Sequence, residues 1–428
     1  MQKVFVLSRT KKQLMPTSPA RARVLLTKKR AAVYRMHPFT IILKDRKDGE
    51  TQPIELKIDP GSKTTGMAMV TNKTVVWAAN LNHKGQQIKN ALEKRRGIRQ
   101  SRRSRKTRYR QPRFLNRTRS KGWLPPSLMS RVDNVTTWTR KLLSYVPISE
   151  IQVETVRFDM QKMVNPEISG IEYSQGSLLG YELREYLLEK WHRTCAYCGV
   201  QNIPLEVEHI QPKSKGGSDR VSNLCLSCRD CNQQKGTQDV KDFLKGKLEL
   251  LKTILAQAKA PLKDAAAVNV TRKEIGRRLR VFDLPVSFWS GGRTKMNRVK
   301  QGYAKIHWHD AACVGESGAD VVIPEAIQPL IITAQGRGSR QMCRVDRYGF
   351  PRTNPKAQKQ VYGFQTGDIV KAIVLKGKKQ GTYIGRVAVR TSGSFNVKTV
   401  KELVSGISWK CCRVMQRVDG YAYAVNKN

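Results

Sequence analysis

The stretch CAYCGVQNIPLEVEHIQPKSKGGSDRVSNLCLSCRDCN, residues 195–232, carries the strongest signal in this sequence. It contains two Cys-x-x-Cys pairs, Cys195 with Cys198 and Cys228 with Cys231. The two-residue spacing lets both thiolates of a pair reach one ion, so the four cysteines predict a tetrahedral zinc site. One interpretation is a zinc ribbon that only stabilises a fold, since four-cysteine zinc sites are mostly structural.

The polar residues between and after the two pairs favour hydrolysis of phosphodiesters. Mg²⁺ is a hard ion that takes oxygen ligands, here expected from Glu208 and the Asn232 amide. His209, neutral near pH 7, can take the proton of an attacking water. The stretch resembles the HNH endonuclease motif. The resemblance implies that His209 is the general base, that Glu208 and Asn232 bind the metal, and that Asn223 braces the turn of a ββα domain.

The charge of the chain indicates a polyanionic partner. Its 428 residues include 80 Lys or Arg and 33 Asp or Glu, which leaves a formal net charge of +47. Such a field concentrates nucleic acid, and the binding should weaken as salt releases counterions. We expect no membrane association, because the sequence shows no long apolar run and no lipidation signal. The nine cysteines suit a reducing, cytoplasmic compartment, and we expect a prokaryotic one.

The first 52 residues predict a small basic module. Val4–Leu7 is a short strand candidate, and a basic helix is expected from about Ala20 to Arg30. Ser18 and Pro19 are suited to the N-cap and the first helical position.

Three acidic residues far apart in the sequence have a common setting. Asp59 ends the alternating strand candidate that starts at Ile54, before a turn and a second strand from Met67 to Val70, and Glu154 ends another strand candidate. Asp310 can open a helix, and His307 lies one helical turn before it. Each acid alone is usually a turn residue or a cap. Together they can hold two Mg²⁺ ions for phosphodiester cleavage, with His307 as a base.

A dense basic run lies between the first two acids. From Lys94 to Arg119 there are 13 Lys or Arg in 26 residues and no acid. We expect a helix that orders on nucleic acid, because backbone phosphates would neutralise its self-repulsion. The candidate contacts are Arg95, Arg96, Arg99, Arg102, Arg103, Arg105, Arg108 and Arg110.

The remaining segments are read from their periodicity. One helix is expected over 240–260 and another from Ala265 to Arg280, followed by a strand at Val286–Trp289 and a loop at Ser290–Lys295. After Gly336, short strand patterns between glycine turns predict a small antiparallel barrel or sandwich. These strand candidates are residues 346–350, 368–375, 381–391, 409–414 and 421–425.

The order of these parts resembles the IscB family of transposon-encoded nucleases over nearly the full length. Gln13-Leu-Met-Pro16 corresponds to the family's Pro-Leu-Met-Pro signature, with Gln13 in place of the first proline. The resemblance implies a multidomain α/β protein whose RNase H-like RuvC sheet is split into three segments. The implied domains are an N-terminal module (1–52), RuvC segment one (53–82), an arginine-rich bridge helix (83–121), RuvC segment two (122–190), a zinc-containing HNH domain (191–240), a linker helix with RuvC segment three (241–335) and a β-rich region that reads a target-adjacent motif (336–428).

The resemblance also implies an RNA-guided DNA endonuclease, monomeric as a protein, in a ribonucleoprotein with an omega-type guide RNA. The HNH site would cut the guide-paired strand of double-stranded DNA, and the RuvC site would cut the displaced strand. Mg²⁺ would act at both sites, through Asp59, Glu154 and Asp310 at one and Glu208 and Asn232 at the other. Two alternatives stay open: an HNH homing endonuclease that reads DNA by protein contacts, and a non-catalytic RNA-binding protein.

Overall fold

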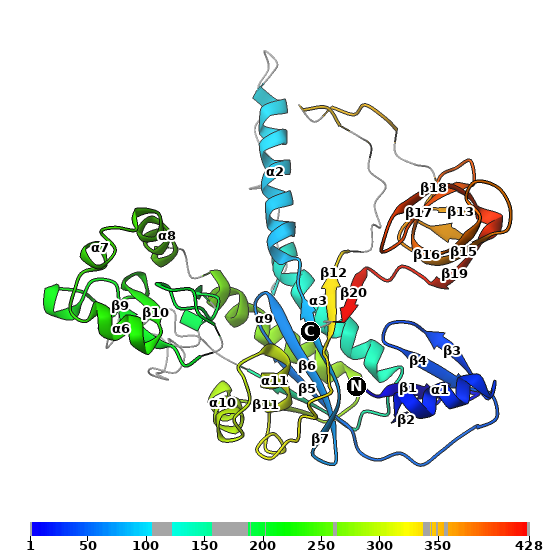
Figure 1. The fold of residues 1–428 in the computed structure, drawn as a ribbon, viewed down its shortest axis with the longest axis horizontal. Helices are drawn as coiled ribbons and strands as arrows, with labels where there is room; N and C mark the ends of the chain where they lie inside the picture. The colour runs from blue at the N-terminus through cyan, green and yellow to red at the C-terminus, as the bar shows by residue number, and fades with distance from the viewer. Residues whose placement is uncertain are drawn as a thin grey trace.

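A mixed sheet of seven strands forms the centre of the computed structural model (Figure 1). The strand order is β11-β8-β5-β6-β7-β12-β20. Strands β5, β6 and β7 form an antiparallel meander, β8 and β11 extend it in parallel beyond β5, and β12 runs parallel to β7. The bounds are β5 (Glu55–Pro60), β6 (Thr64–Thr71), β7 (Thr74–Asn82), β8 (Glu150–Glu154), β11 (Val286–Trp289), β12 (Leu330–Ala334) and β20 (Tyr421–Val425). The strands expected around Ile54–Asp59, Met67–Val70, Glu154 and Val286–Trp289 are confirmed.

The structure describes residues 2–104, 122–155, 187–188, 190–201, 203–259, 263–336, 343, 345–347, 350–354 and 358–425. Over these ranges, none of the helices combines the length and the apolar character that a membrane crossing requires.

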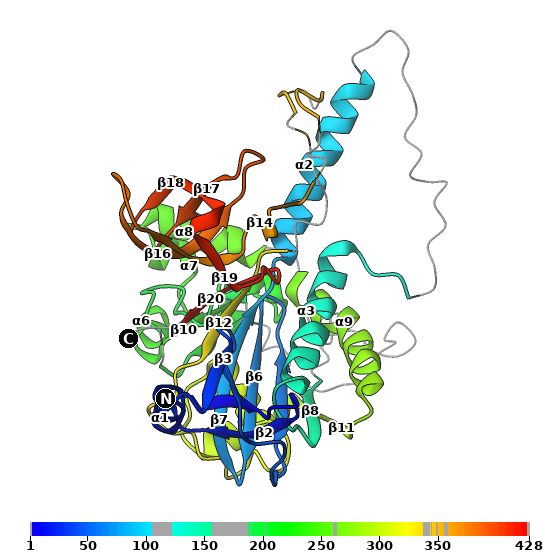
Figure 2. The ribbon, with the colours of Figure 1, turned by 90° about the vertical axis from the view of Figure 1, so that its right-hand side faces the viewer.

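Helices cover both faces of the central sheet, and strand β6 shows why. Successive side chains of a strand point to opposite faces. Met67 and Met69 therefore join the core that contains Trp138, while Ala68 and Val70 pack with Trp308 on the other face. The first face carries α3 (Pro126–Leu143) and α9 (Lys263–Leu279), which lie side by side in Figure 2, and the second carries α11 (His307–Ala312).

The N-terminal module is a four-stranded sheet of order β2-β1-β4-β3 with one helix. Its elements are β1 (Val4–Leu7), β2 (Gln13–Thr17), α1 (Pro19–Thr27), β3 (Ala31–Arg35) and β4 (Thr40–Leu43). The expected strand and helix are confirmed, and the Ser18 side chain accepts a hydrogen bond from the Arg21 amide as an N-cap. Strands β2, β3 and β4 have no counterpart among the elements expected from the sequence.

A long helix, α2 (Gly85–Ser104), projects away from the central sheet (Figure 1). It begins nine residues before the dense basic run that starts at Lys94, within the segment 83–121 that the sequence assigns to a bridge helix. The basic residues beyond Ser104 lie outside the described residues.

The cysteine-containing segment forms a separate unit with its own core. It contains the hairpin of β9 (Glu206–His209) and β10 (Leu224–Ser227), followed by α6 (Arg229–Lys235). The single helix expected over 240–260 is wrong: the structure has α7 (Val240–Phe243) and α8 (Leu248–Ala258). Gly246 lies in the break, and glycine disfavours the helical interior.

Two further expectations are corrected. The loop expected at Ser290–Lys295 is the start of α10 (Gly291–Lys300), with the Ser290 hydroxyl accepting from the Arg293 amide at 3.3 Å. The helix begins with two glycines, which disfavour helix, so the sequence did not indicate that Ser290 is an N-cap. Tyr421–Val425 was assigned to the C-terminal module but pairs with β12 of the central sheet. The Tyr421 ring meets Trp138 edge-on at 5.7 Å, so the core of the central sheet holds this strand.

The C-terminal module is an antiparallel sheet of order β18-β17-β16-β15-β19 with its own apolar core. The strands are β15 (Ile369–Val374), β16 (Gly381–Ala388), β17 (Ser394–Lys398), β18 (Leu403–Ser408) and β19 (Cys412–Gln416), beside a short hairpin of β13 (Gln360–Val361) and β14 (Phe364–Gln365). Strands were expected at the positions of β15, β16 and β19, whereas β17 and β18 were missed. The strand expected at 346–350 lies partly outside the described residues.

Candidate functional site

Asp59 and Glu154 lie at the same edge of the central sheet. Strands β5 and β8 run in parallel with Ile58 opposite Val153, so the next residue of each strand is at the same level. Carboxyl ends of parallel strands meet at one edge, which makes neighbours of two acids that are far apart in the sequence. Glu154 is buried, and only 15% of the Asp59 side chain is exposed.

A glycine brings the helix that carries His307 and Asp310 to this edge. Gly66 pairs with Asp59 across β5 and β6. A Cβ added to Gly66 would lie 1.9 Å from the His307 carbonyl oxygen, so only glycine lets α11 begin against the strand. His307 Nδ1 lies 4.0 Å from Asp59 Oδ2, and Asp310 is buried in the first turn of the same helix. The fold thus gathers the four predicted side chains at the sheet edge.

The carboxylates perturb one another. The pKa of Asp59 is raised well above its ordinary value, first by burial and then by the negative charges of Glu154 and Asp310. The positive charges of Arg193 and Lys305 act in the opposite direction. Charge of this kind favours a bound divalent cation, and carboxylate oxygens are the ligands that Mg²⁺ prefers.

Arg131 holds the turn that follows Asp59. This residue of α3 donates from Nη2 to the Pro60 carbonyl at 2.5 Å and from Nε to the Gly61 carbonyl at 2.7 Å. Burial lowers its pKa to about 10, although the Asp59 charge opposes that shift. Arg131 could not be predicted from the sequence, because no local pattern shows that a helical arginine reaches a strand end.

Lys57 and Asn297 hold the other end of α11. Lys57, buried within β5, donates from Nζ to the Val314 carbonyl at 2.8 Å. Asn297 of α10 donates to the carbonyls of Cys313 and Gly315 at 3.0 and 2.8 Å. In the sequence, the charged Lys57 lies between the apolar residues Leu56 and Ile58. The same alternation is typical of a solvent-facing strand position, so it did not indicate that Lys57 is buried.

Arg298 of α10 contacts the acid itself. Its Nε lies 2.9 Å from Asp310 Oδ1, and both side chains are about nine-tenths buried. This ion pair fixes the Asp310 carboxylate relative to its helix.

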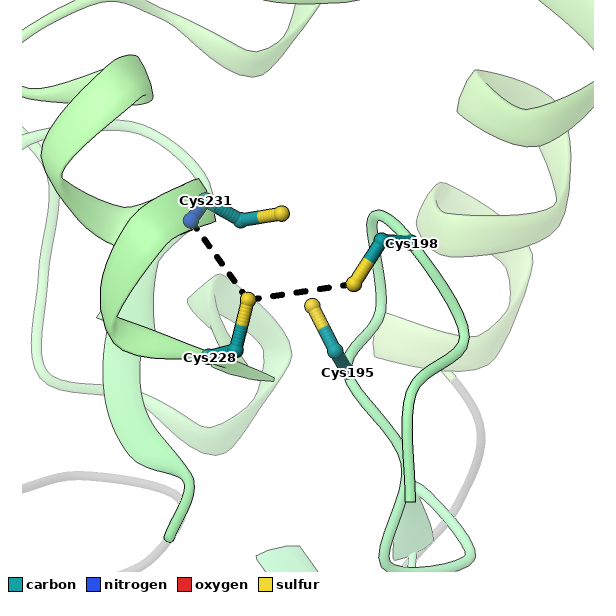
Figure 3. Close-up of side chains that lie close together, drawn as sticks. All are labelled: Cys195, Cys198, Cys228 and Cys231. Carbon is teal, nitrogen blue, oxygen red and sulfur yellow. Dashed lines mark hydrogen bonds between the residues drawn. The ribbon is translucent and has the colours of Figure 1, made fainter. Parts of the chain in front are cut away.

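The four cysteines converge as a metal site requires within the separate unit of β9, β10 and α6, which is called the insert from here on. Their Sγ atoms all lie within 4.8 Å of one another, and Cys198 Sγ is 3.7 Å from Cys228 Sγ (Figure 3). Burial would raise the pKa of Cys195, but the backbone N–H groups of Cys198, Cys228 and Tyr197 bring it to about 7. Four soft thiolates in this arrangement fit a zinc ion.

Among the described residues, the three carboxylates of the sheet edge are not gathered as tightly.

His209 ends β9, and its ring is held by a carboxylate that sequence analysis did not single out. His209 Nε2 lies 2.7 Å from Asp219 Oδ1, and Lys213 binds the other Asp219 oxygen at 2.8 Å. Hydrogen bonds from Lys213 and then His209 lower the pKa of Asp219. The signal for Asp219 was its place in the Gly-Gly-Ser-Asp loop between the two strands, which alone predicts only a turn.

Asn223 closes that loop. Its amide accepts from the Gln211 N–H at 2.9 Å and donates to the carbonyls of Gln211 and Ser218 at 2.9 and 2.8 Å. These bonds join the end of β9 to the start of β10, the place where a bracing residue was expected.

The two predicted oxygen ligands of the insert have separate partners. Glu208 Oε1 forms a buried ion pair with Lys235 Nζ of α6 at 2.7 Å, and Lys235 also donates to the His209 carbonyl at 2.8 Å. Asn232 donates to Glu206 Oε2 at 2.6 Å. Alternate residues of a strand face the same way, so Glu206 and Glu208 both meet α6. Metal binding by Glu208 and Asn232 stays a prediction. In the structure, Lys235 is the ion-pair partner of Glu208, and Glu206 is the hydrogen-bond partner of Asn232.

Of the predicted nucleic-acid contacts, those up to Arg103 lie on the projecting helix α2. Arg95, Arg96 and Arg99 are exposed there, and Arg103 is partly buried. The side chain of Arg102 and all of Arg105, Arg108 and Arg110 lie outside the described residues. A single helix thus displays several exposed cations of the type that contacts backbone phosphates.

Comparisons with known proteins identify the insert. Among curated proteins, no sequence matches this chain. Cas9 of Streptococcus thermophilus in complex with the GGAA PAM is similar at 13% identity, covering 61% of this chain and 32% of that chain, with a TM-score of 0.22. The type II-C Cas9 enzyme from Actinomyces naeslundii is 15% identical over 43% of this chain and 26% of that chain, with a TM-score of 0.16. The present chain therefore spans a third or less of those proteins. Family models match the chain as an RRXRR protein over residues 4–176 and as an HNH endonuclease over residues 195–238, so the insert carries an HNH endonuclease domain.

Proposed function

We propose that this protein is an RNA-guided endonuclease of the IscB type that cuts both strands of double-stranded DNA. The HNH domain cuts the strand paired to an omega-type guide RNA, and the edge of the central sheet, a RuvC site, cuts the displaced strand. The two family matches support a nuclease with this order of parts. Carboxylate and amide side chains would hold Mg²⁺ at both sites, and the four cysteines would hold a structural zinc ion.

One observation carries the proposal: two sets of acid and base side chains occupy two domains with separate cores. Asp59, Glu154 and Asp310 belong to the central sheet and its helix α11. His209 belongs to a hairpin whose apolar core is separate from that of the sheet. Two sites on separate cores suit two strands that diverge once a guide has opened the duplex.

In the HNH domain, His209 acts as the general base. Nε2 faces Asp219, so in the tautomer that donates Nε2–H to that carboxylate, Nδ1 is the acceptor for a water proton. Glu208 and Asn232 would hold Mg²⁺, which when bound would polarise the phosphate and stabilise charge on the leaving oxygen. Asn223 keeps the loop of Asp219 closed, which holds the orienting carboxylate in place.

At the sheet edge, His307 lies beside Asp59 and takes the proton of the attacking water. Arg131 fixes the strand end that carries Asp59, and Arg298 fixes Asp310. The carboxylates supply the oxygen ligands for metal-assisted cleavage.

The guide RNA accounts for the charge of the chain. A bound transcript would offset much of the +47, and α2 presents exposed arginines to its backbone. The region after Gly336 then reads the motif beside the target. The protein is a monomer inside a prokaryotic ribonucleoprotein.

The test is reconstitution with RNA that co-purifies when the protein is expressed with its flanking genomic sequence. On a duplex labelled on each strand, His209→Ala should nick only the displaced strand and Asp59→Ala only the guide-paired strand, and EDTA should stop both cuts. If either substitution abolished both cuts, the two-site assignment would be wrong. Specific cutting by RNase-treated protein would show that the protein itself reads the DNA.

A further inference from the structure

The turn that opens the HNH domain has an uncommon backbone. His192 and Arg193 are consecutive residues with φ of 54° and 57°, in the left-handed region that residues with side chains seldom adopt. Trp191, buried in the core of the insert, precedes them and donates from Nε1 to the Leu224 carbonyl at 3.3 Å. Thr194 Oγ1 donates back to the Trp191 carbonyl at 2.7 Å. The insert therefore fixes this turn, and backbone strain of this kind concentrates at functional positions.

The turn directs Arg193 out of its own domain and onto the central one. Arg193 Nη1 donates to the Lys305 carbonyl at 3.0 Å, and Lys305 lies two residues before His307. The Arg193 charge acts on Asp59 to favour the carboxylate form. A cation that belongs to the HNH domain is thus placed beside the acids of the other site.

We propose that Arg193 is a phosphate-binding residue of the sheet-edge site, supplied to that site by the HNH domain. This inference rests on the proposed function. Three carboxylates repel a phosphodiester, so the site needs positive groups of the protein as well as bound metal. A guanidinium has five N–H donors in a planar fork, and it can hold the Lys305 carbonyl and a phosphate oxygen together.

Cutting of the displaced strand then depends on where the HNH domain lies. Arg193 lies at the sheet-edge site only while the insert is docked at Lys305, since its backbone is fixed to the insert through Trp191 and Thr194. Movement of the insert away from the sheet would remove this cation from the site.

The experiment measures single-turnover rate constants for each strand with the complete ribonucleoprotein. Arg193→Ala should slow the displaced-strand cut on the order of 100-fold, the effect of removing one preorganised donor to developing charge. The guide-paired cut should keep its rate. Arg193→Lys should recover part of the loss, since it restores the charge without the fork. Arg229→Ala is the matched control: this exposed arginine lies in the same domain, and its loss should leave both rates unchanged.

The outcomes separate this inference from the proposed function. Wild-type protein that cuts neither strand would refute both. Wild-type cutting of both strands, with Arg193→Ala at wild-type rates, would overturn only the role of Arg193. Equal loss on both strands, together with loss of bound zinc, would also overturn it, because the residue would then serve the folding of the insert.

Discussion

Individual contacts decide the geometry of both sites, and Asp219 is the clearest case. It orients His209 from the loop between β9 and β10, and Lys213 shares its carboxylate. Asp219→Asn keeps the shape but removes the charge, so the preferred tautomer of His209 is lost. We expect the guide-paired cut to slow by about 10- to 100-fold, within the range found for general bases and their supports. Strand-resolved cleavage measures it, and an unchanged rate would show that Asp219 does not orient the base.

Gly66 is the corresponding residue at the sheet edge. Gly66→Ala places a methyl group 1.9 Å from the His307 carbonyl oxygen, so α11 must move. We expect a loss of about 1–3 kcal/mol in the free energy of unfolding and a strong loss of the displaced-strand cut. Gly246→Ala is the control, because nothing lies within 4 Å of its Cβ. Denaturant unfolding measures the stability of each variant, and strand-resolved cleavage measures its activity. Equal behaviour of Gly66→Ala and Gly246→Ala would contradict the close approach of α11 to β6.

At the scale of elements, the cysteine site links β10, α6 and the loop that carries Cys195. Cys228 caps α6, and its sulfur accepts from the Cys231 N–H at 3.5 Å. Cys228→Ser should lose bound zinc and unfold the HNH domain, while the central sheet stays folded on its own core. Zinc content and limited proteolysis measure this. Cys411→Ser, outside the cluster, should keep full zinc; retention of zinc by Cys228→Ser would exclude the four-cysteine site.

At the scale of the whole molecule, Asp419 joins three parts of the chain. Its Oδ2 accepts from Arg35 of the N-terminal module at 2.6 Å and from Lys141 of α3 at 2.8 Å, and the Tyr423 hydroxyl of β20 also donates to it. Burial acts to raise the pKa of Asp419, but Lys141, Tyr423 and Arg35 outweigh it and lower the pKa. A lowered pKa stabilises the folded state above the unfolded value of about 3.9 and loses that contribution as the pH falls through the folded value.

Asp419→Asn should therefore lower the free energy of unfolding by about 3 kcal/mol near pH 7, the cost of leaving two partly buried cations unpaired. The difference from wild type should shrink as the pH falls from the unfolded value of about 3.9 through the lowered folded pKa of Asp419, below which the wild-type carboxylate is also neutral. Asp320→Asn removes an exposed pair with Lys73 and should change little. Thermal and denaturant unfolding across pH measure this. A constant difference at all pH values would show that the charge of Asp419 is not the cause.

The sequence alone indicated the two Cys-x-x-Cys pairs, the acidic residue at the end of each strand and the helix that carries His307 and Asp310. These features follow from spacing and periodicity, which neighbouring residues determine. The sequence alone could not show that Gly66 admits α11, that Lys235 pairs with Glu208, that Tyr421–Val425 returns to the central sheet or that Arg193 reaches Lys305. Those contacts join residues of separate segments, and only the packing of one segment on another decides which side chains meet.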